Sequence, residues 1–308
     1  MSGRPNAGSS GSISKTDSFE NRELVGFLFC LPGIALLALM LLGPFLFAIG
    51  LSFTNLRLAS PLPVSFVGFD NYVAILTSDS FWQALGNNVY FTAVVVPVQT
   101  ALALGLAILV NRQERSVIAF RAVYFMPVVV VMTVAATVWL ILFNPERGLI
   151  NAFLRFISGG HLESAWLRAP GSAMPAIMII SIWQGVGFQM IVILAALQSI
   201  PHELYEQAEI DGAVPRQRFL YVTLPQLRNT LIFVATVTMI LAFRLFDQVW
   251  VTTRGGPLGA TRTMMIEMVE LGYQRQMISR GSAVAVVFFL IVVTITLIQR
   301  KLIREGED

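Results

Sequence analysis

Long apolar stretches separated by short polar segments dominate the pattern of the chain. Six of them are mostly apolar over about 20 residues, the length that an α-helix needs to cross the hydrocarbon core of a bilayer. They cover residues 24–51, 88–110, 124–143, 176–197, 231–251 and 282–298. Because hydrocarbon offers no water to backbone polar groups, a spanning segment must satisfy them internally as a helix. The pattern therefore predicts an all-α integral membrane protein with six transmembrane helices.

The two ends of the chain differ from the apolar stretches. Residues 1–23 are rich in Gly, Ser and charge and cannot bury enough apolar surface to fold, so they are predicted to form a disordered tail. The first apolar stretch is too long for the core of a signal peptide and lacks a convincing cleavage site, so it is expected to remain as a helix. The predicted organisation is this tail, a membrane domain over 24–303 with a polar loop over 200–228, and a second tail over 304–308.

Composition supports a membrane protein and argues against other classes. Hydrophobic residues make up 56% of the 308 residues, against about 45–50% in soluble domains, and the mean hydropathy is +0.71. The net charge is +3, but the basic residues are scattered singly and form no stripe that could follow phosphates, so nucleic-acid binding is not predicted. The single cysteine, Cys30, cannot form an intrachain disulfide, and His161 and His202 lack metal-ligand spacing. No metal site is predicted.

Basic residues near the ends of the apolar stretches predict the orientation in the membrane. With both termini in the cytoplasm, the short cytoplasmic segments hold both lysines and many arginines: Arg4, Lys15, Arg22, Arg112, Arg115, Arg121, Arg216, Arg218, Arg228, Arg300, Lys301 and Arg304. The arginines on the opposite side are spread over much longer loops: Arg147, Arg155, Arg168, Arg254, Arg262, Arg275 and Arg280. The bias predicts that both termini are cytoplasmic, as is the polar loop between the fourth and fifth stretches.

This polar loop contains the segment EQAEIDGAVPRQRFLYVTLP, residues 206–225. Pro201 stands where a helix can begin, because the first turn does not need its missing N–H group. Gly212 is expected to end that helix, since glycine tolerates the left-handed cap conformation. A second short helix is expected over residues 214–222, with Pro225 ending it. The pattern by itself is also typical of an ordinary helix at a membrane surface.

The same segment resembles the EAA loop of the membrane subunits of binding-protein-dependent ABC importers, whose pattern is E-A-A-x-x-D-G-A, then a phenylalanine, then L-P. The matching residues are Glu206, Ala208, Asp211, Gly212, Ala213, Phe219, Leu224 and Pro225. Gln207 departs from the pattern at a surface position. Gly255-Gly256-Pro257, after Phe246-Asp247, is similar to the carbohydrate and glycerol-phosphate branch, which includes the maltose-type permeases. The resemblance covers nearly all of residues 24–303.

The resemblance implies a type I ABC importer permease whose loop docks on a partner ATPase. It implies as partners a second homologous permease, a dimer of ATP-binding cassette ATPases, an extracytoplasmic solute-binding protein and a sugar, in the plasma membrane of a bacterium or archaeon. ATP and Mg²⁺ would be bound by the ATPase, and this chain is expected to hold no cofactor and to be no enzyme. Its nearest approach to a phosphate-binding loop has Ser9 and Ser14 where the pattern requires glycine.

An ion-coupled secondary transporter is the alternative function. Such a protein needs proton or ion sites within its spans and usually contains inverted repeats. The apolar stretches hold few titratable residues, and the sequence contains no convincing repeat. The ABC importer is therefore the favoured hypothesis.

The fourth stretch carries polar, small and aromatic residues on one helical face, at positions i, i+3, i+4 and i+7. They are Ser181, Gln184, Gly185 and Phe188. Such groups can hold a sugar, but small and polar residues also line packed helix interfaces, and the sequence leaves both interpretations open. In the maltose-type permeases, sugar contacts fall at positions corresponding to this face and to Thr238, so the resemblance implies a substrate pathway. The apolar residues Leu241, Ala242 and Leu245 replace more polar or bulkier groups there, so maltose itself is not implied.

Arg244 and Asp247 lie near the end of the fifth stretch, where a charge is costly and usually faces a cavity or a partner. Their i, i+3 spacing allows a mutual ion pair, which is slightly favoured at the outer end of a span. A role in the substrate pathway is the alternative. Gln248, Gln99 and Trp183 are weaker candidates of the same kind.

Overall fold

The computed structural model describes residues 15–304 except residue 59 and residues 113–114. The described residues form helices and connecting loops without a β-strand, and Thr54 and Phe66 form one isolated antiparallel bridge. The chain divides into two compact units, Met1–Gly50 and Leu51–Asp308. The prediction of an all-α fold is confirmed.

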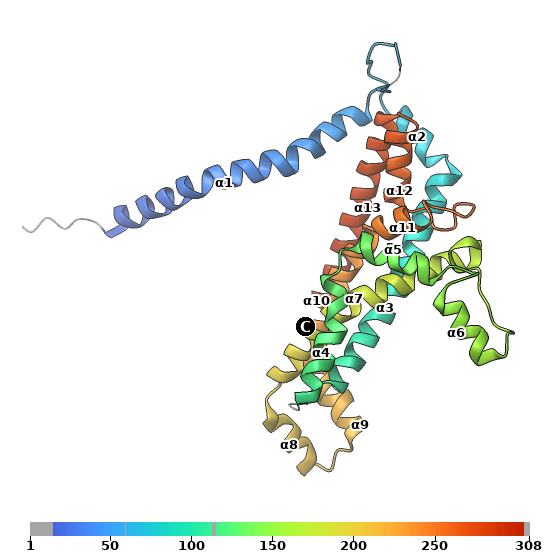
Figure 1. Ribbon diagram of the computed structural model, residues 1–308. Helices are drawn as coiled ribbons and strands as arrows, with labels where there is room; N and C mark the ends of the chain where they lie inside the picture. The colour runs from blue at the N-terminus through green and yellow to red at the C-terminus, as the bar shows by residue number, and fades with distance from the viewer. Residues whose placement is uncertain (1–14, 59, 113–114, 305–308) are drawn as a thin grey trace, which may run out of the picture. The chain divides into compact units, whose positions relative to one another are not determined.

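The helices follow one another as shown in Figure 1. The α-helices are α1 (Lys15–Ser52), α2 (Asp70–Leu76), α3 (Asp79–Leu109), α4 (Arg115–Val129), α5 (Met132–Leu142), α6 (Leu149–Ser158), α7 (Pro170–Ser199), α8 (His202–Ile210), α9 (Pro215–Arg218), α10 (Leu224–Phe243), α11 (Asp247–Thr252), α12 (Met264–Val269) and α13 (Ile278–Arg304). A short 3₁₀ helix covers Trp166–Arg168, and π-helical turns cover Phe219–Thr223 and Glu270–Gln274.

Helix α1 makes up the described part of the first unit. Its segment Gly26–Ser52 is long and apolar enough to cross a membrane. Because α1 begins at Lys15, residues 15–23 are helical rather than part of a disordered tail. That segment contains neither Gly nor Pro, and the glycines of the tail all precede it. The predicted tail residues 1–14 and 305–308 lie outside the described residues.

Five helices of the described chain are long and apolar enough to span a membrane, and a bent pair forms a sixth candidate. The five are Gly26–Ser52, Asp79–Leu109, Pro170–Ser199, Pro215–Thr252 and Ile278–Gln299. The pair consists of Val117–Val129 and Met132–Leu142, which meet at an angle of 101°. The number of predicted spans is consistent with this arrangement.

The third predicted stretch, residues 124–143, is not one straight helix. Helix α4 begins earlier and ends at Val129, and α5 starts after Val131, whose backbone is extended. Pro127 lies in the last turn of α4 and has no N–H group, so the helical hydrogen-bond ladder is already incomplete there. The bend therefore follows from a proline in the last turn of α4, just before the helix ends at Val129.

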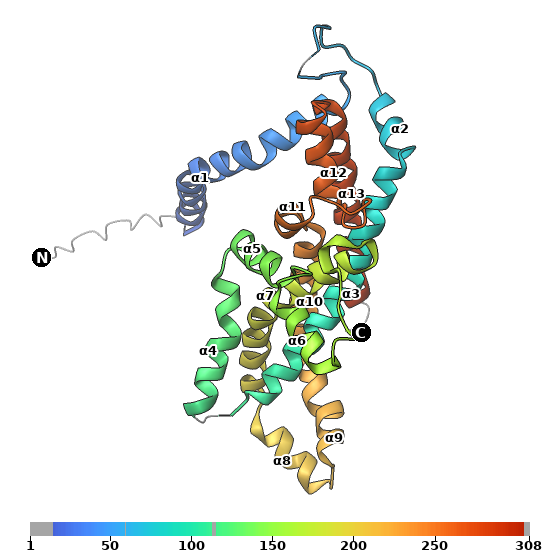
Figure 2. The ribbon, with the colours of Figure 1, turned by 45° about the vertical axis from the view of Figure 1, so that its right-hand side comes forward.

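The second unit is built around α3 and α7, which pack against each other, with α4 against α7 and α10 against α3. Figures 1 and 2 show α8 and α9 at one end of this unit and α2 at the other. Close approach of α4 and α7 depends on Gly187, because a Cβ at this position would clash with the carbonyl oxygen of Tyr124. Near the α8–α9 end, buried apolar residues join α3, α7 and α10: Ala103, Ala107, Met190, Ile193 and Leu227.

The fifth span is interrupted between α10 and α11, at residues 244–246. Asn88 on α3 is fully buried; its Nδ2 donates to the carbonyl of Phe243 at 3.1 Å, and its Oδ1 accepts from the N–H of Met264 at 2.8 Å. Thr263, also fully buried, donates its hydroxyl to the carbonyl of Leu245 at 2.9 Å. These two side chains satisfy two carbonyls at the break and the first N–H of α12, none of which has a helical partner.

Replacing Asn88 with alanine should destabilise the break, because the carbonyl of Phe243 and the N–H of Met264 would stay buried without partners. We expect the free energy of unfolding to fall by about 1–3 kcal/mol, the usual cost of an unsatisfied buried polar group. Thermal unfolding of the purified protein in lipid nanodiscs would measure it. Val89→Ala is the control, since Val89 is 48% exposed on the same helix. Equal midpoints for the two variants would contradict this role of Asn88.

Candidate functional site

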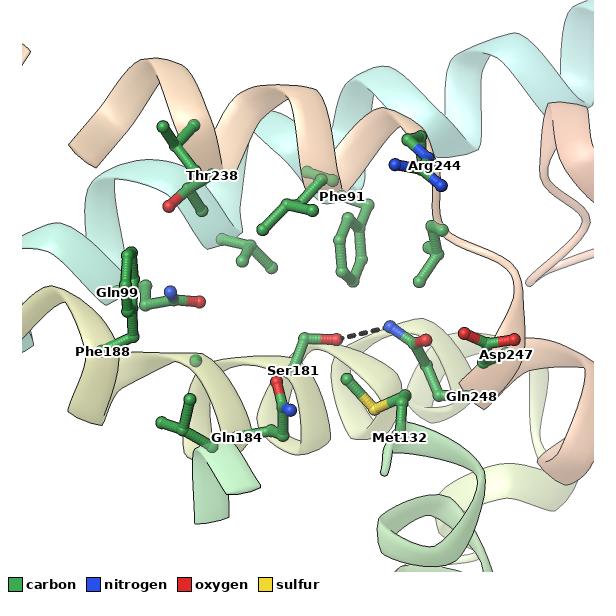
Figure 3. Close-up of a pocket in the computed structure, with 17 residues that line it drawn as sticks. Phe91, Gln99, Met132, Ser181, Gln184, Phe188, Thr238, Arg244, Asp247 and Gln248 are labelled. Carbon is green, nitrogen blue, oxygen red and sulfur yellow. Dashed lines mark hydrogen bonds between the residues drawn. The ribbon is translucent and has the colours of Figure 1, made fainter. Parts of the chain in front are cut away.

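A cavity of about 430 Å³ lies inside the second unit, between α3, α4, α5, α7, α10 and α11 (Figure 3). Its volume falls in the range of small-molecule sites, about 300–1,000 Å³. The lining residues are Phe91, Val95, Gln99, Val128, Met132, Ser181, Gln184, Gly185, Phe188, Val237, Thr238, Leu241, Ala242, Arg244, Leu245, Asp247 and Gln248.

The residues predicted to form a substrate pathway all line this one cavity. Ser181, Gln184, Gly185 and Phe188 come from α7, Thr238 from α10, and Arg244, Asp247 and Gln248 from the break and α11. In Figure 3, Thr238 and Arg244 lie across the cavity from the α7 residues. Trp183 does not line it and instead forms an edge-to-face pair with Trp139, with 5.6 Å between ring centroids.

Several of the polar lining groups already have partners within the protein. The Ser181 hydroxyl accepts from Nε2 of Gln248 at 2.9 Å and donates to the carbonyl of Ile177 at 3.0 Å. Gln184 reaches the carbonyl of Val130, at the bend between α4 and α5, over 3.5 Å. These residues thus hold α7, α11 and the α4–α5 bend together while they face the cavity, so the packing and pathway interpretations are compatible.

Thr238 is held in a similar way. Its hydroxyl oxygen accepts from Nε2 of Gln189, and both side chains are buried. The Oε1 atom of Gln189 has no hydrogen-bond partner among the described residues. The contact joins α7 to α10 and fixes the Thr238 hydroxyl at the cavity wall.

Gly185 makes room for the side chain of Gln99 on α3. A Cβ at Gly185 would lie 2.6 Å from Nε2 of Gln99, closer than side-chain carbons approach in proteins. Gln99 is 5% exposed and lines the cavity. Its side chain forms no hydrogen bond to another described residue. Its amide is therefore a free donor and acceptor at the cavity wall.

Arg244 and Asp247 both line the cavity, but they do not pair with each other. The ion pairs within 4.0 Å among the described residues are Arg155–Glu163, Arg168–Glu146, Arg218–Glu209, Arg262–Glu267, Arg262–Glu270 and Arg275–Glu270. The slightly favoured mutual pair is thus not formed. Residues at i and i+3 face each other only on a continuous helix, whereas the chain leaves the helical path at residues 244–246.

Apart from Gln99, a weaker candidate, the sequence did not single out the cavity residues contributed by α3, α4 and α5. Phe91, Val95 and Gln99 recur at i, i+4 and i+8 on α3, which is a detectable helical face, but two of them are apolar and resemble core residues. Val128 and Met132 flank the bend, and their place at the cavity depends on an angle that periodicity does not predict.

The loop over 200–228 contains a short helix, a tight turn and the start of a second helix, as predicted. Helix α8 ends at Ile210, and Gly212 takes a left-handed conformation with φ of +75°. The carboxamide oxygen of Gln217 accepts from the N–H of Val214 at 2.9 Å and caps α9. Nothing lies within 4 Å of a Cβ built on Gly212, so its backbone angle rather than crowding favours glycine there.

Contacts across the turn hold α8 to the following segment. Arg218 forms an ion pair with Glu209, and the hydroxyls of Tyr205 and Thr223 lie 3.0 Å apart in a hydrogen bond. These two contacts fix the position of α8 relative to α9 and the π turn.

Pro225 does not end the second helix, contrary to the prediction. Helix α9 continues through the π-helical turn Phe219–Thr223 into α10, and Pro225 is an early residue of α10. The wider π turn shifts the carbonyl that a proline ring would otherwise contact one turn earlier, so the helix accommodates Pro225. The loop is thereby joined to the fifth span without a flexible connection.

The residues that match the EAA pattern differ in exposure. Glu206, Asp211, Gly212 and Pro225 are exposed, whereas Ala208, Ala213, Phe219 and Leu224 are partly buried. The loop also exposes apolar side chains that the motif does not include: Ile210, Val214 and Tyr221, at 85%, 55% and 77%. Within the described chain, no group of three or more His, Cys, Asp or Glu residues could hold a metal ion.

Residues 23–305 match the family described as binding-protein-dependent transport system inner membrane component. The trehalose/maltose transport system permease protein of Thermococcus litoralis is 34% identical over 243 residues, which cover 79% of this chain and 81% of that protein. The sulfoquinovosyl glycerol transport system permease protein of Agrobacterium fabrum is 32% identical over 289 residues, 92% of this chain and 91% of that protein.

A solved structure has a similar fold. It is the crystal structure of a bacterial alginate ABC transporter in complex with an alginate pentasaccharide-bound periplasmic protein. The matched chain has a TM-score of 0.81 at 21% identity, and the match covers 94% of this chain and 96% of that one. At this identity the likeness concerns the fold alone.

Cysteine labelling can test whether the cavity holds water. Phe188 faces the cavity and is 41% exposed, while Ile179 on the same helix is 39% exposed and does not line it. With Cys30 replaced by serine, Phe188→Cys in nanodiscs should react with a hydrophilic thiol reagent about tenfold faster than Ile179→Cys, because only a hydrated thiol ionises readily. Equal rates would show that the cavity is not open to water.

Proposed function

The chain belongs to the family of inner membrane components of binding-protein-dependent transport systems, and we propose that it provides the membrane path for a sugar, as an oligosaccharide, a polyol or a glycerol phosphate. It is a multi-pass permease subunit of an ABC importer and not an enzyme. ATP hydrolysis takes place in a separate subunit, which in this proposal binds both ATP and Mg²⁺.

The observation that carries the proposal is the cavity between α3, α7 and the broken fifth span. It combines amide and hydroxyl groups from Gln99, Ser181, Gln184, Thr238 and Gln248 with the aromatic rings of Phe91 and Phe188. Hydroxyls of a sugar can bond to the polar groups, and the apolar face of its ring can lie on an aromatic side chain. The names of the relatives that transport trehalose, maltose and sulfoquinovosyl glycerol support the same class of solute.

The proposed assembly contains a second homologous permease, a dimer of ATP-binding cassette ATPases and an extracytoplasmic solute-binding protein. The second permease would complete the path, and the apolar span of α1 can pack against its helices. The distribution of basic residues supports cytoplasmic termini, and in this proposal α8 and α9 lie in the cytoplasm of a bacterial or archaeal cell.

The loop over 200–228 is proposed to couple the ATPase to the path. Its exposed apolar residues Ile210, Val214 and Tyr221 can enter a cleft on the partner, as buried apolar residues do in stable interfaces. The continuous helix from Pro215 through α10 then carries movement of the loop to Thr238 and Arg244 at the cavity.

Transport by the assembled complex in proteoliposomes tests the proposed function. Uptake of labelled sugars should require the solute-binding protein and internal ATP, and vanadate should abolish it. Uptake that follows a proton or sodium gradient without ATP would support the ion-coupled secondary transporter instead.

The turn at Gly212 gives a prediction about coupling. Gly212→Val should strain the left-handed turn by about 1–2 kcal/mol, since β-branched residues disfavour positive φ, and should reduce co-purification of the ATPase by roughly five- to thirtyfold. Gly212→Asn is the matched control, because asparagine tolerates this conformation and a Cβ meets no neighbour there. Equal recruitment of the ATPase by the two variants would contradict the coupling role of this turn.

A further inference from the structure

The charged residues of the cavity are one arginine and one aspartate, and each lacks an ion-pair partner among the described residues. Arg244 ends α10 and Asp247 begins α11, so the break in the fifth span places opposite charges at one cavity wall. No other residue in the cavity lining carries a formal charge. The lining is therefore electrically balanced, but its two charges are not joined within 4.0 Å.

The geometry of the break keeps these charges available. The carbonyls of Phe243 and Leu245, on either side of Arg244, are bonded by Asn88 and Thr263, which fixes the backbone between the two charged residues. Arg244 also stands at the C-terminal end of a 20-residue helix, where the helix dipole stabilises a cation. An interrupted helix near a transport path is a common way to present such groups to a solute.

The balance of charge restricts what the cavity can hold. A solute with a net charge would add a charge that no other residue of the lining balances, which is costly within a membrane-spanning segment. A hydroxyl group can accept a hydrogen bond from a guanidinium and donate one to a carboxylate, so an uncharged polyhydroxylated solute can satisfy both residues together. The neutral amides and hydroxyls of Gln99, Gln184 and Thr238 extend the same kind of bonding.

We propose that Arg244 and Asp247 are bridged by the solute and select a saccharide or polyol without net charge over a phosphorylated or otherwise anionic one. This inference rests on the proposed function and narrows its substrate class. A zwitterion would also preserve the charge balance, but it has few hydroxyl groups to offer the free amide of Gln99 and the other polar groups of the lining. Hydroxyl-rich solutes therefore fit this lining better.

The test measures uptake by the complete importer in proteoliposomes with three sets of labelled probes: a mixture of neutral mono-, di- and trisaccharides, glycerol 3-phosphate, and glycine betaine. The wild-type importer should take up a neutral saccharide and neither of the other probes. Arg244→Gln and Asp247→Asn should each raise KM for that saccharide roughly ten- to hundredfold, through loss of a hydrogen bond to a charged group. The exposed Arg147→Gln and Asp79→Asn variants are matched controls and should leave KM unchanged.

Inhibition by charged analogues separates a direct role from a structural one. Asp247→Asn leaves Arg244 as the single charge, so a sugar phosphate should inhibit saccharide uptake by this variant about tenfold more strongly than by wild type. Saccharide uptake by Arg244→Gln should in turn be inhibited about tenfold more strongly by a cationic amino sugar than uptake by wild type. A general packing defect would produce neither change of preference.

The outcomes distinguish this inference from the function on which it rests. Vanadate-sensitive uptake of glycerol 3-phosphate or glycine betaine by wild type would overturn the inference and leave an ABC importer in place. An unchanged KM in both cavity variants would also overturn the inference. The same holds if Asp247→Asn is not inhibited more strongly by the sugar phosphate and Arg244→Gln is not inhibited more strongly by the amino sugar. Wild-type complexes that import none of the probes in a vanadate-sensitive manner would contradict the proposed sugar transport itself.

Discussion

Backbone groups at the interruption between α10 and α11 must be satisfied inside a membrane protein, and the arrangement of the site depends on how this is done. Asn88 bonds both the end of α10 and the start of α12, and Thr263 bonds the carbonyl of Leu245. Without these contacts, the cost of unpaired polar groups would favour a continuous helix. On a continuous helix, Arg244 and Asp247 would be neighbours on one face and could form an ion pair. The break therefore determines that the charges face a cavity.

Most of the spans could be predicted from the sequence because a bilayer imposes one length and one kind of secondary structure on them. Features that depend on local departures from the helix could not. The 101° bend after Val129 depends on Pro127. A proline does not always bend a helix, because Pro175 lies within α7 without ending it. Likewise, Pro225 suggested a helix end, but the π turn before it lets the helix continue. In both cases the outcome is decided by neighbouring backbone carbonyls, whose positions the apolar pattern does not specify.

The predicted pathway residues show what periodicity can and cannot establish about a site. Residues of one face, such as Ser181 and Phe188, were grouped correctly because they lie on one regular helix. Residues on other helices, such as Phe91 and Met132, could not be grouped with them, since this requires the packing of α3 and α5 against α7. The glycine at 185 gives a hint only after the fold is known, because its role is to admit the side chain of Gln99.

The alternatives of packing and transport for the polar residues are not exclusive in this fold. A polar side chain in a membrane span is costly without a hydrogen-bond partner when no solute is bound. Ser181 and Gln248 are hydrogen-bonded to each other in this state. A solute hydroxyl can replace one such bond without leaving a buried group unsatisfied, provided that the helices shift slightly. Helix α10 can supply that shift, because it runs as one piece from the π turn in the loop over 200–228 to Arg244. The proposed docking of the loop and the proposed binding of the solute therefore act on the two ends of the same rigid element.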